Sequence, residues 1–215
     1  YYAPQGWASD DSDAVERLKV QHGTSFCYPV SSIGSHVSVV PNHQVFRETP
    51  LHTRANVAYF GTFGYELDLN KLTKEEQEEV KEQIRFMKQY RKLLQFGSFY
   101  RLSSPFEGDG NVTAWMAVSE DKREAVLGWY RILSHANPPL ARLRLSGLDE
   151  RLCYRITENG RERTGVYYGD ELMNAGLITT EGVSGETAPG EKGGCDFDSR
   201  IFVLKAERSC LEGEE

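Results

Sequence analysis

The chain has 215 residues, of which 39% are hydrophobic and 27% are charged, and its formal net charge is −7. This length and composition are typical of a folded protein with a sizeable core, which excludes a disordered chain. The acidic balance argues against nucleic-acid binding, and no apolar run approaches the roughly 18 residues that a membrane-spanning helix needs.

The first elements predicted along the chain are a helix and a strand. An acidic cluster ending at Asp13 precedes a helical pattern over residues 14–20, and carboxylates favour the positive end of a helix dipole. Residues 26–30 are apolar and read as a short buried strand. A polar loop is expected from there through Pro41.

Three further elements complete the first half. A helix is predicted from Pro50 towards Tyr59, and a strand over residues 60–67. The Thr-Lys-Glu-Glu sequence of residues 73–76 has the spacing of a capping box and opens an amphipathic helix that runs to Phe96. The order helix, strand, helix, strand, helix indicates βα units on a parallel sheet.

From Gly97 onward the chain shows short strand patterns. They cover residues 112–118, 125–133, 142–145, 152–157, 166–168 and 201–204. Asn159-Gly160 between two of them predicts a hairpin turn, and the spacing predicts an antiparallel β-sandwich. Up to Phe96 there are 11 basic and 12 acidic side chains, and after it 14 and 20. We therefore predict two domains, residues 1–96 and 97–215.

Cysteine and histidine spacing indicates no metal site. The four cysteines are far apart in the sequence: Cys27, Cys153, Cys195 and Cys210. We expect all four to be reduced thiols. The spacing of His36, His43 and His52 fits no standard ligand pattern. No metal and no cofactor are expected.

The stretch from Trp7 to Asp10 is the strongest candidate for chemistry. It stands where a strand should lead into a helix. An indole offers an apolar face to a sugar ring, and a carboxyl beside it can have a raised pKa and act as a general acid. Taken alone, the same stretch also reads as an ordinary acidic helix cap, and Asp13 fits the capping position.

Several long blocks of the sequence resemble the family 36 α-galactosidases. They are residues 7–14, 34–38, 41–44, 56–68, 99–102, 168–174 and 196–200. The resemblance implies the last βα units of a (β/α)8 TIM barrel followed by a C-terminal β-domain. It also implies retaining hydrolysis of terminal α-galactosyl residues of melibiose- and raffinose-type oligosaccharides through a covalent galactosyl–enzyme intermediate.

The resemblance assigns the acid/base role to Asp10, which stands in the family's Trp-x-Ser-Asp motif. Ala8 replaces the family's Thr, a small departure that leaves the carboxyl in place. Trp7 and His36 are candidates for substrate binding, although Trp7 fits packing at the barrel rim equally well. The family's Lys-x-Asp nucleophile motif and its Gly-rich galactose-binding segment are absent from this chain.

The chain is therefore expected to be the C-terminal portion of such an enzyme, partnered by the remaining N-terminal part and inactive alone. The family also implies a homo-oligomer, and we expect a cytoplasmic location. Two other interpretations stay open. One is a non-catalytic accessory β-domain that binds sugar or forms an interface, and the other is a fragment of a raffinose-synthase-like transglycosylase.

Overall fold

The computed structural model describes residues 4–136, 138–179 and 196–209. Its first half consists of the helices α1 (Ala14–Thr24), α2 (Leu51–Ala58) and α3 (Lys74–Phe96), the strands β1 (Gly34–Ser38) and β2 (Thr62–Glu66), and the 3-10 turns η1 (Val30–Ser32) and η2 (Leu69–Lys71). The predicted alternation of helix and strand is confirmed. The capping box of α3 is confirmed too, because the Thr73 and Glu76 side chains each accept a hydrogen bond from the other residue's backbone N–H.

The strand predicted over residues 26–30 is wrong. This segment is a turn, with the Phe26 and Tyr28 side chains exposed, and the true strand, β1, lies inside the predicted loop. The Phe26 ring lies under the guanidinium of Arg101, 4.1 Å from its centre. The apolar residues of the turn thus lie at the surface, where Phe26 covers Arg101. The small residues of β1 are buried instead, because other elements pack around them.

Three stretches of backbone run parallel in the first half. β1 pairs with β2 in the register Gly34↔Thr62 to Ser38↔Glu66. On the other side of β1, a single parallel bridge joins Gly6 to Ile33. The segment that leads to Trp7 therefore enters beside β1 as a third parallel element.

The second half forms a large antiparallel sheet. Its strands are β3 (Ser98–Ser103), β4 (Val112–Val118), β5 (Glu124–Arg131), β7 (Leu152–Glu158), β8 (Arg161–Glu162), β9 (Tyr167–Tyr168) and β11 (Asp198–Ser209). The order is β3-β4-β5-β11-β7-β8, with β9 also paired to β7. A separate two-stranded ladder joins β6 (Arg142–Leu143) to β10 (Leu177–Ile178), and α4 (Gly169–Asn174) lies close to it in sequence.

The antiparallel prediction is thus confirmed, but the strands do not divide into two sheets of similar size. One seven-stranded sheet dominates, and the ladder and α4 cover one of its faces. The hairpin at Asn159-Gly160 is confirmed, with φ of 45° and 80° at its two residues. β3, β10 and α4 were not predicted. β10 and α4 are too short to show a period, and β3 carries polar residues.

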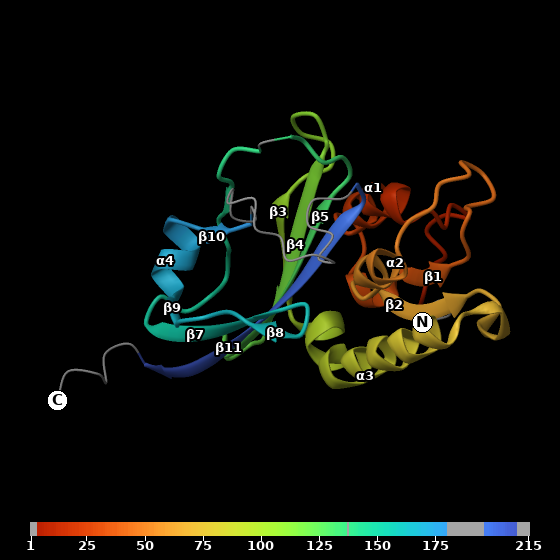
Figure 1. Cartoon of the computed structure of the whole chain (residues 1–215). Coiled ribbons are helices and arrows are strands. Elements are labelled where there is room, and N and C mark those ends of the chain that lie inside the picture. Colours follow the sequence, from red (N-terminus) through yellow and green to blue (C-terminus); the bar gives the residue numbers. More distant parts are fainter. Residues whose placement is uncertain (1–3, 137, 180–195, 210–215) are drawn as a thin grey trace.

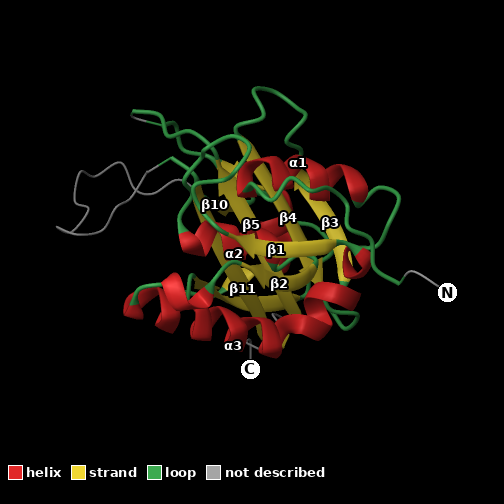
Figure 2. Ribbon diagram, turned by 90° about the vertical axis from the view of Figure 1, so that its right-hand side faces the viewer, coloured by secondary structure: helices red, strands yellow, loops and turns green. Residues whose placement is uncertain are grey.

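Both faces of the large sheet are covered (Figures 1 and 2). Trp115 on β4 faces α1, α2 and α3, while the next residue, Met116, faces α4 and the ladder. The centre of β4 is therefore buried throughout, as in a strand between two layers. Among the described residues, no helix has the length and apolar composition to cross a membrane.

The prediction of four reduced cysteines is wrong for Cys153, which is disulfide-bonded. Cys27 is free and exposed in the turn after α1. Cys195 and Cys210 lie outside the described residues.

Candidate active site

Trp7 and Asp10 are joined directly. The indole Nε1–H of Trp7 donates a hydrogen bond of 3.0 Å to Oδ1 of Asp10, and both side chains are exposed. Asp10 does not cap the following helix. The cap is Asp13, whose Oδ2 accepts hydrogen bonds from the backbone N–H groups of Val15 and Glu16. The Asp10 carboxylate is therefore not used as the helix cap, a role that its position in the sequence would have allowed.

Asp10 lies at the carboxyl edge of the parallel strands. Gly6 is bridged to Ile33, just before β1 begins, and the Ser12 carbonyl accepts a 2.7 Å hydrogen bond from Oγ of Ser38, where β1 ends. The chain between Gly6 and Ser12 therefore follows β1 along its length. Functional side chains of parallel α/β proteins gather at this edge.

His36 completes a cluster of the three site residues predicted from sequence. Its imidazole packs against the indole of Trp7, with 4.5 Å between ring centres and 37° between planes. Burial lowers the pKa of His36, the Glu66 carboxylate acts in the opposite direction, and the Arg17 guanidinium lowers it further. The ring is therefore neutral at neutral pH, and it supports Trp7, which holds Asp10.

Two glycines make room for these rings, and sequence reasoning missed their role. Gly64 pairs with His36, and a Cβ at Gly64 would lie 2.8 Å from Cδ2 of the imidazole. A Cβ at Gly34 would lie 3.3 Å from Cε3 of Trp7. Glycine inside a strand pattern is a signal that another group approaches the backbone closely. That signal could have predicted the contacts at Gly34 and Gly64.

Arg17 is a second residue that sequence reasoning missed. It is buried on α1, where its Nη2 donates to the Gly34 carbonyl and its Nη1 lies 3.5 Å from the Ser9 carbonyl. Burial lowers the pKa of Arg17, while the Asp11 and Glu66 carboxylates raise it. Arg17 thus ties β1 to the residue that precedes Asp10.

The loop after β1 is anchored to the same region. Arg47 forms an ion pair with the buried carboxylate of Asp13. Asn42 closes the turn of the loop by accepting backbone hydrogen bonds from Gln44 and Val45. His43 is exposed on this loop, and His52 lies on α2, where it lines a cavity between α3 and the large sheet. Within the described parts of the chain, no group of three or more His, Cys, Asp or Glu side chains is placed to hold a metal ion.

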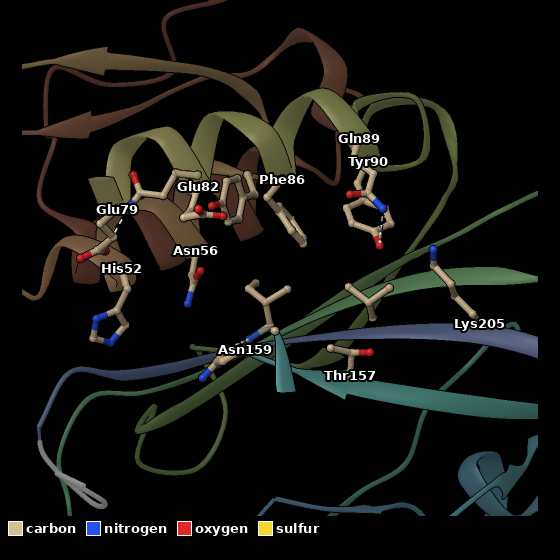
Figure 3. A pocket seen from close by; sticks show the side chains of 15 residues that line it. His52, Asn56, Glu79, Glu82, Phe86, Gln89, Tyr90, Thr157, Asn159 and Lys205 are labelled. Carbon is tan, nitrogen blue, oxygen red and sulfur yellow. Dashed lines mark hydrogen bonds between the residues drawn. The ribbon is translucent and has the colours of Figure 1, made fainter. Parts of the chain in front are cut away.

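A cavity of about 730 Å³ lies between α3, α2 and the strands β7 and β11. Figure 3 shows side chains of α3 facing those of the sheet across it. Trp7, Asp10 and His36 are not among its lining residues, which include Tyr59, Tyr90 and others from both halves of the chain. Sequence patterns did not predict this cavity, because its walls come from segments far apart in the chain.

Comparison with protein families matches almost the whole chain. Residues 1–97 match the Melibiase family, and residues 112–204 match the glycosyl hydrolase family 36 C-terminal domain. The α-galactosidase AgaA of Geobacillus stearothermophilus is 56% identical over 206 residues, which are 96% of this chain and 26% of that protein. The chain thus spans about a fifth to a quarter of the length of curated relatives that it matches.

Solved structures agree with these matches. An α-galactosidase from Lactobacillus brevis superposes with a TM-score of 0.89 at 46% identity, over 100% of this chain and 28% of that one. A variant of AgaA in complex with raffinose superposes with a TM-score of 0.84 at 50% identity, over 96% of this chain and 26% of that one. The two halves of the chain and their arrangement therefore match one region of much longer glycosidases.

Proposed function

The chain belongs to glycoside hydrolase family 36, and from this premise we propose that it is the C-terminal portion of a retaining α-galactosidase. The single observation that carries the proposal is the Trp7–Asp10 pair, with an exposed carboxylate held by an indole at the carboxyl edge of parallel strands. The proposed reaction is hydrolysis of terminal α-D-galactosyl residues of melibiose- or raffinose-type oligosaccharides by double displacement. Relatives that were solved with raffinose and with stachyose support this substrate class.

We further propose that residues 1–96 are the last βα units of a (β/α)8 barrel, and residues 97–215 a C-terminal β-domain. The parallel pairing of β1 with β2 and the parallel bridge at Gly6 support the barrel assignment. So does the alternation of these strands with α1 and α2. The remaining strands, and the nucleophilic carboxylate, are then supplied by the N-terminal part of the enzyme.

Asp10 acts as the acid/base in this proposal. It first donates a proton to the departing glycosidic oxygen and later removes a proton from the water that attacks the galactosyl–enzyme intermediate. The indole N–H of Trp7 binds Oδ1, which orients the carboxyl group so that Oδ2 can reach the substrate. Because 50% of Trp7 is exposed, its ring also offers a surface on which a sugar can stack.

The test is Asp10→Ala in the intact enzyme. Removal of the acid/base should lower raffinose turnover by about 10²–10⁴-fold, the usual contribution of general acid–base catalysis. Azide should restore turnover of an activated aryl α-galactoside, because that leaving group needs no proton and azide replaces the activated water. Asp109→Ala, the same change at an exposed residue of the loop between β3 and β4, is the matched control. Near-normal raffinose turnover by Asp10→Ala would overturn the assignment.

A further inference from the structure

The cavity between α3 and the large sheet has an aromatic wall. The rings of Tyr59, Phe86 and Tyr90 follow one another, with centres 4.6 Å apart for the first pair and 4.8 Å for the second. The opposite wall is the strand β11, through Ile201 and Val203. Aromatic faces on one side of a cavity this size suit a flat ligand that presents C–H groups.

Polar groups lie around the aromatic wall, and most are planar amides and carboxylates (Figure 3). Those on α3 include Glu79, Glu82 and Gln89, while Asn56 and Asn159 face them from α2 and the sheet. Some of these groups already have partners within the chain, since Glu79 accepts from Gln83, Glu82 pairs with Arg85 and Asn56 donates to Ser199. Planar side chains carry several donor and acceptor positions each, and the remaining ones suit the neighbouring hydroxyl groups of a sugar.

A tyrosine hydroxyl at the same cavity has a spare hydrogen-bonding position. Tyr59 is only 4% exposed and lines the cavity, and among the described residues none forms a hydrogen bond with its hydroxyl. Burial raises the pKa of Tyr59, and the Tyr65 hydroxyl and the Glu79 carboxylate raise it further. The hydroxyl therefore stays protonated and can donate to a ligand in the cavity.

The charges around the cavity disfavour a strongly charged ligand. Lys205 is a cation on its lining, but it lies 3.6 Å from Glu124 and over the ring of Tyr90. Glu79 and Glu82 stand on the α3 side, Glu82 in an ion pair with Arg85, so a phosphate or carboxylate would meet like charge at Glu79. Lys205 in turn disfavours a polycation.

We propose that this cavity is a non-catalytic binding site for a neutral oligosaccharide. A sugar would stack on the ring of Tyr90 in place of the Lys205 ammonium, and take hydrogen bonds from the Tyr59 hydroxyl and from the Thr157 side chain on β7. The cavity volume of about 730 Å³ lies within the range of small-molecule sites. The proposal rests on the proposed function only for the choice of raffinose as a probe.

The test uses the intact enzyme carrying Asp10→Asn, so that raffinose is not consumed. Raffinose and maltotriose are titrated separately while the methyl resonances of Ile201 and Val203, which line the cavity, are followed by NMR. Either sugar should shift both methyl groups. Tyr90→Ala should weaken this binding about tenfold, the order of a lost stacking contact. Thr157→Val keeps the shape of the side chain and should weaken binding as well. It is a second test in case Tyr90→Ala fails to fold.

Phe96→Ala is the matched control, because Phe96 is an exposed aromatic residue on the same helix, outside the cavity. It should leave the titration unchanged. The proposal is overturned if neither sugar shifts the two methyl groups, or if the shifts persist with the same affinity in both Tyr90→Ala and Thr157→Val. Loss of raffinose turnover in Asp10→Ala tests the catalytic proposal independently, since Asp10 lies outside the cavity.

Discussion

At the scale of single residues, the site depends on side chains that pack in series. Asp10 is held by Trp7, Trp7 packs against His36, and His36 lies directly over Gly64. Only the first of these four residues is proposed to exchange protons. The others set the direction in which its carboxyl points. A small increase in volume at Gly64 should therefore move the Asp10 carboxyl and lower the catalytic rate.

Gly64→Ala tests this series. The new Cβ would lie 2.8 Å from Cδ2 of His36, so the imidazole must move and Trp7 with it. We expect kcat/KM of the intact enzyme for raffinose to fall about tenfold, since misplacement of a catalytic group by a fraction of an ångström to 1 Å costs ten- to a hundredfold.

Gly23→Ala is the matched control, because a Cβ at that helical position would meet nothing within 4 Å. It should retain full activity and gain about 0.5–1 kcal/mol in free energy of unfolding. Equal kinetics for Gly64→Ala and Gly23→Ala would show that the packing of His36 does not position Asp10.

At the scale of elements, α3 joins the two halves of the chain. Its charged face points to solvent, while Val80, Met87 and Leu94 are buried against the sheet and the other helices. The same core contains Trp115 and Val203 from the antiparallel sheet. The helix therefore owes its stability to this packing more than to its own propensity.

Leu94→Ala should lower the free energy of unfolding by about 2–5 kcal/mol, because Leu94 is fully buried and its removal leaves a cavity. Phe96→Ala, two residues later and 75% exposed, should change it by no more than about 0.5 kcal/mol. Denaturant unfolding of the two variants provides the comparison. Similar values for both would mean that the end of α3 does not pack on the sheet in solution.

At the scale of the whole molecule, the parallel part is small. β1 and β2 form a two-stranded sheet, and within the described residues β2 pairs with no second strand. An unpaired strand edge invites association with another chain, and two parallel strands are too few for independent stability. The proposed remainder of the enzyme would cover this edge and bring the nucleophile to Asp10.

The purified 215-residue chain should therefore show no hydrolysis of an aryl α-galactoside, and light scattering should show that it associates at concentrations where the intact enzyme does not. Co-expression with the N-terminal part of the enzyme should restore activity. Measurable turnover by the chain alone would contradict the proposal that the nucleophile lies outside it.

The sequence alone determined the features that depend on neighbouring residues. The capping box at Thr73, the turn at Asn159-Gly160 and the helix cap at Asp13 are set by side chains that bond to backbone a few residues away. Such contacts form whatever the rest of the chain does. The bond between Trp7 and Asp10 is equally local, since only two residues lie between them, but the resemblance to the family, rather than the spacing, singled out this pair.

Only the tertiary structure decided what depends on distant segments. β1 escaped prediction because its Gly and Ser residues are buried by neighbouring strands rather than by their own hydrophobicity. The contact of Gly64 with His36 and the bonds from Arg17 to Ser9 and Gly34 join different elements. The cavity between α3 and the sheet joins residues 52 to 205. Their proximity follows from packing, which no local spacing encodes.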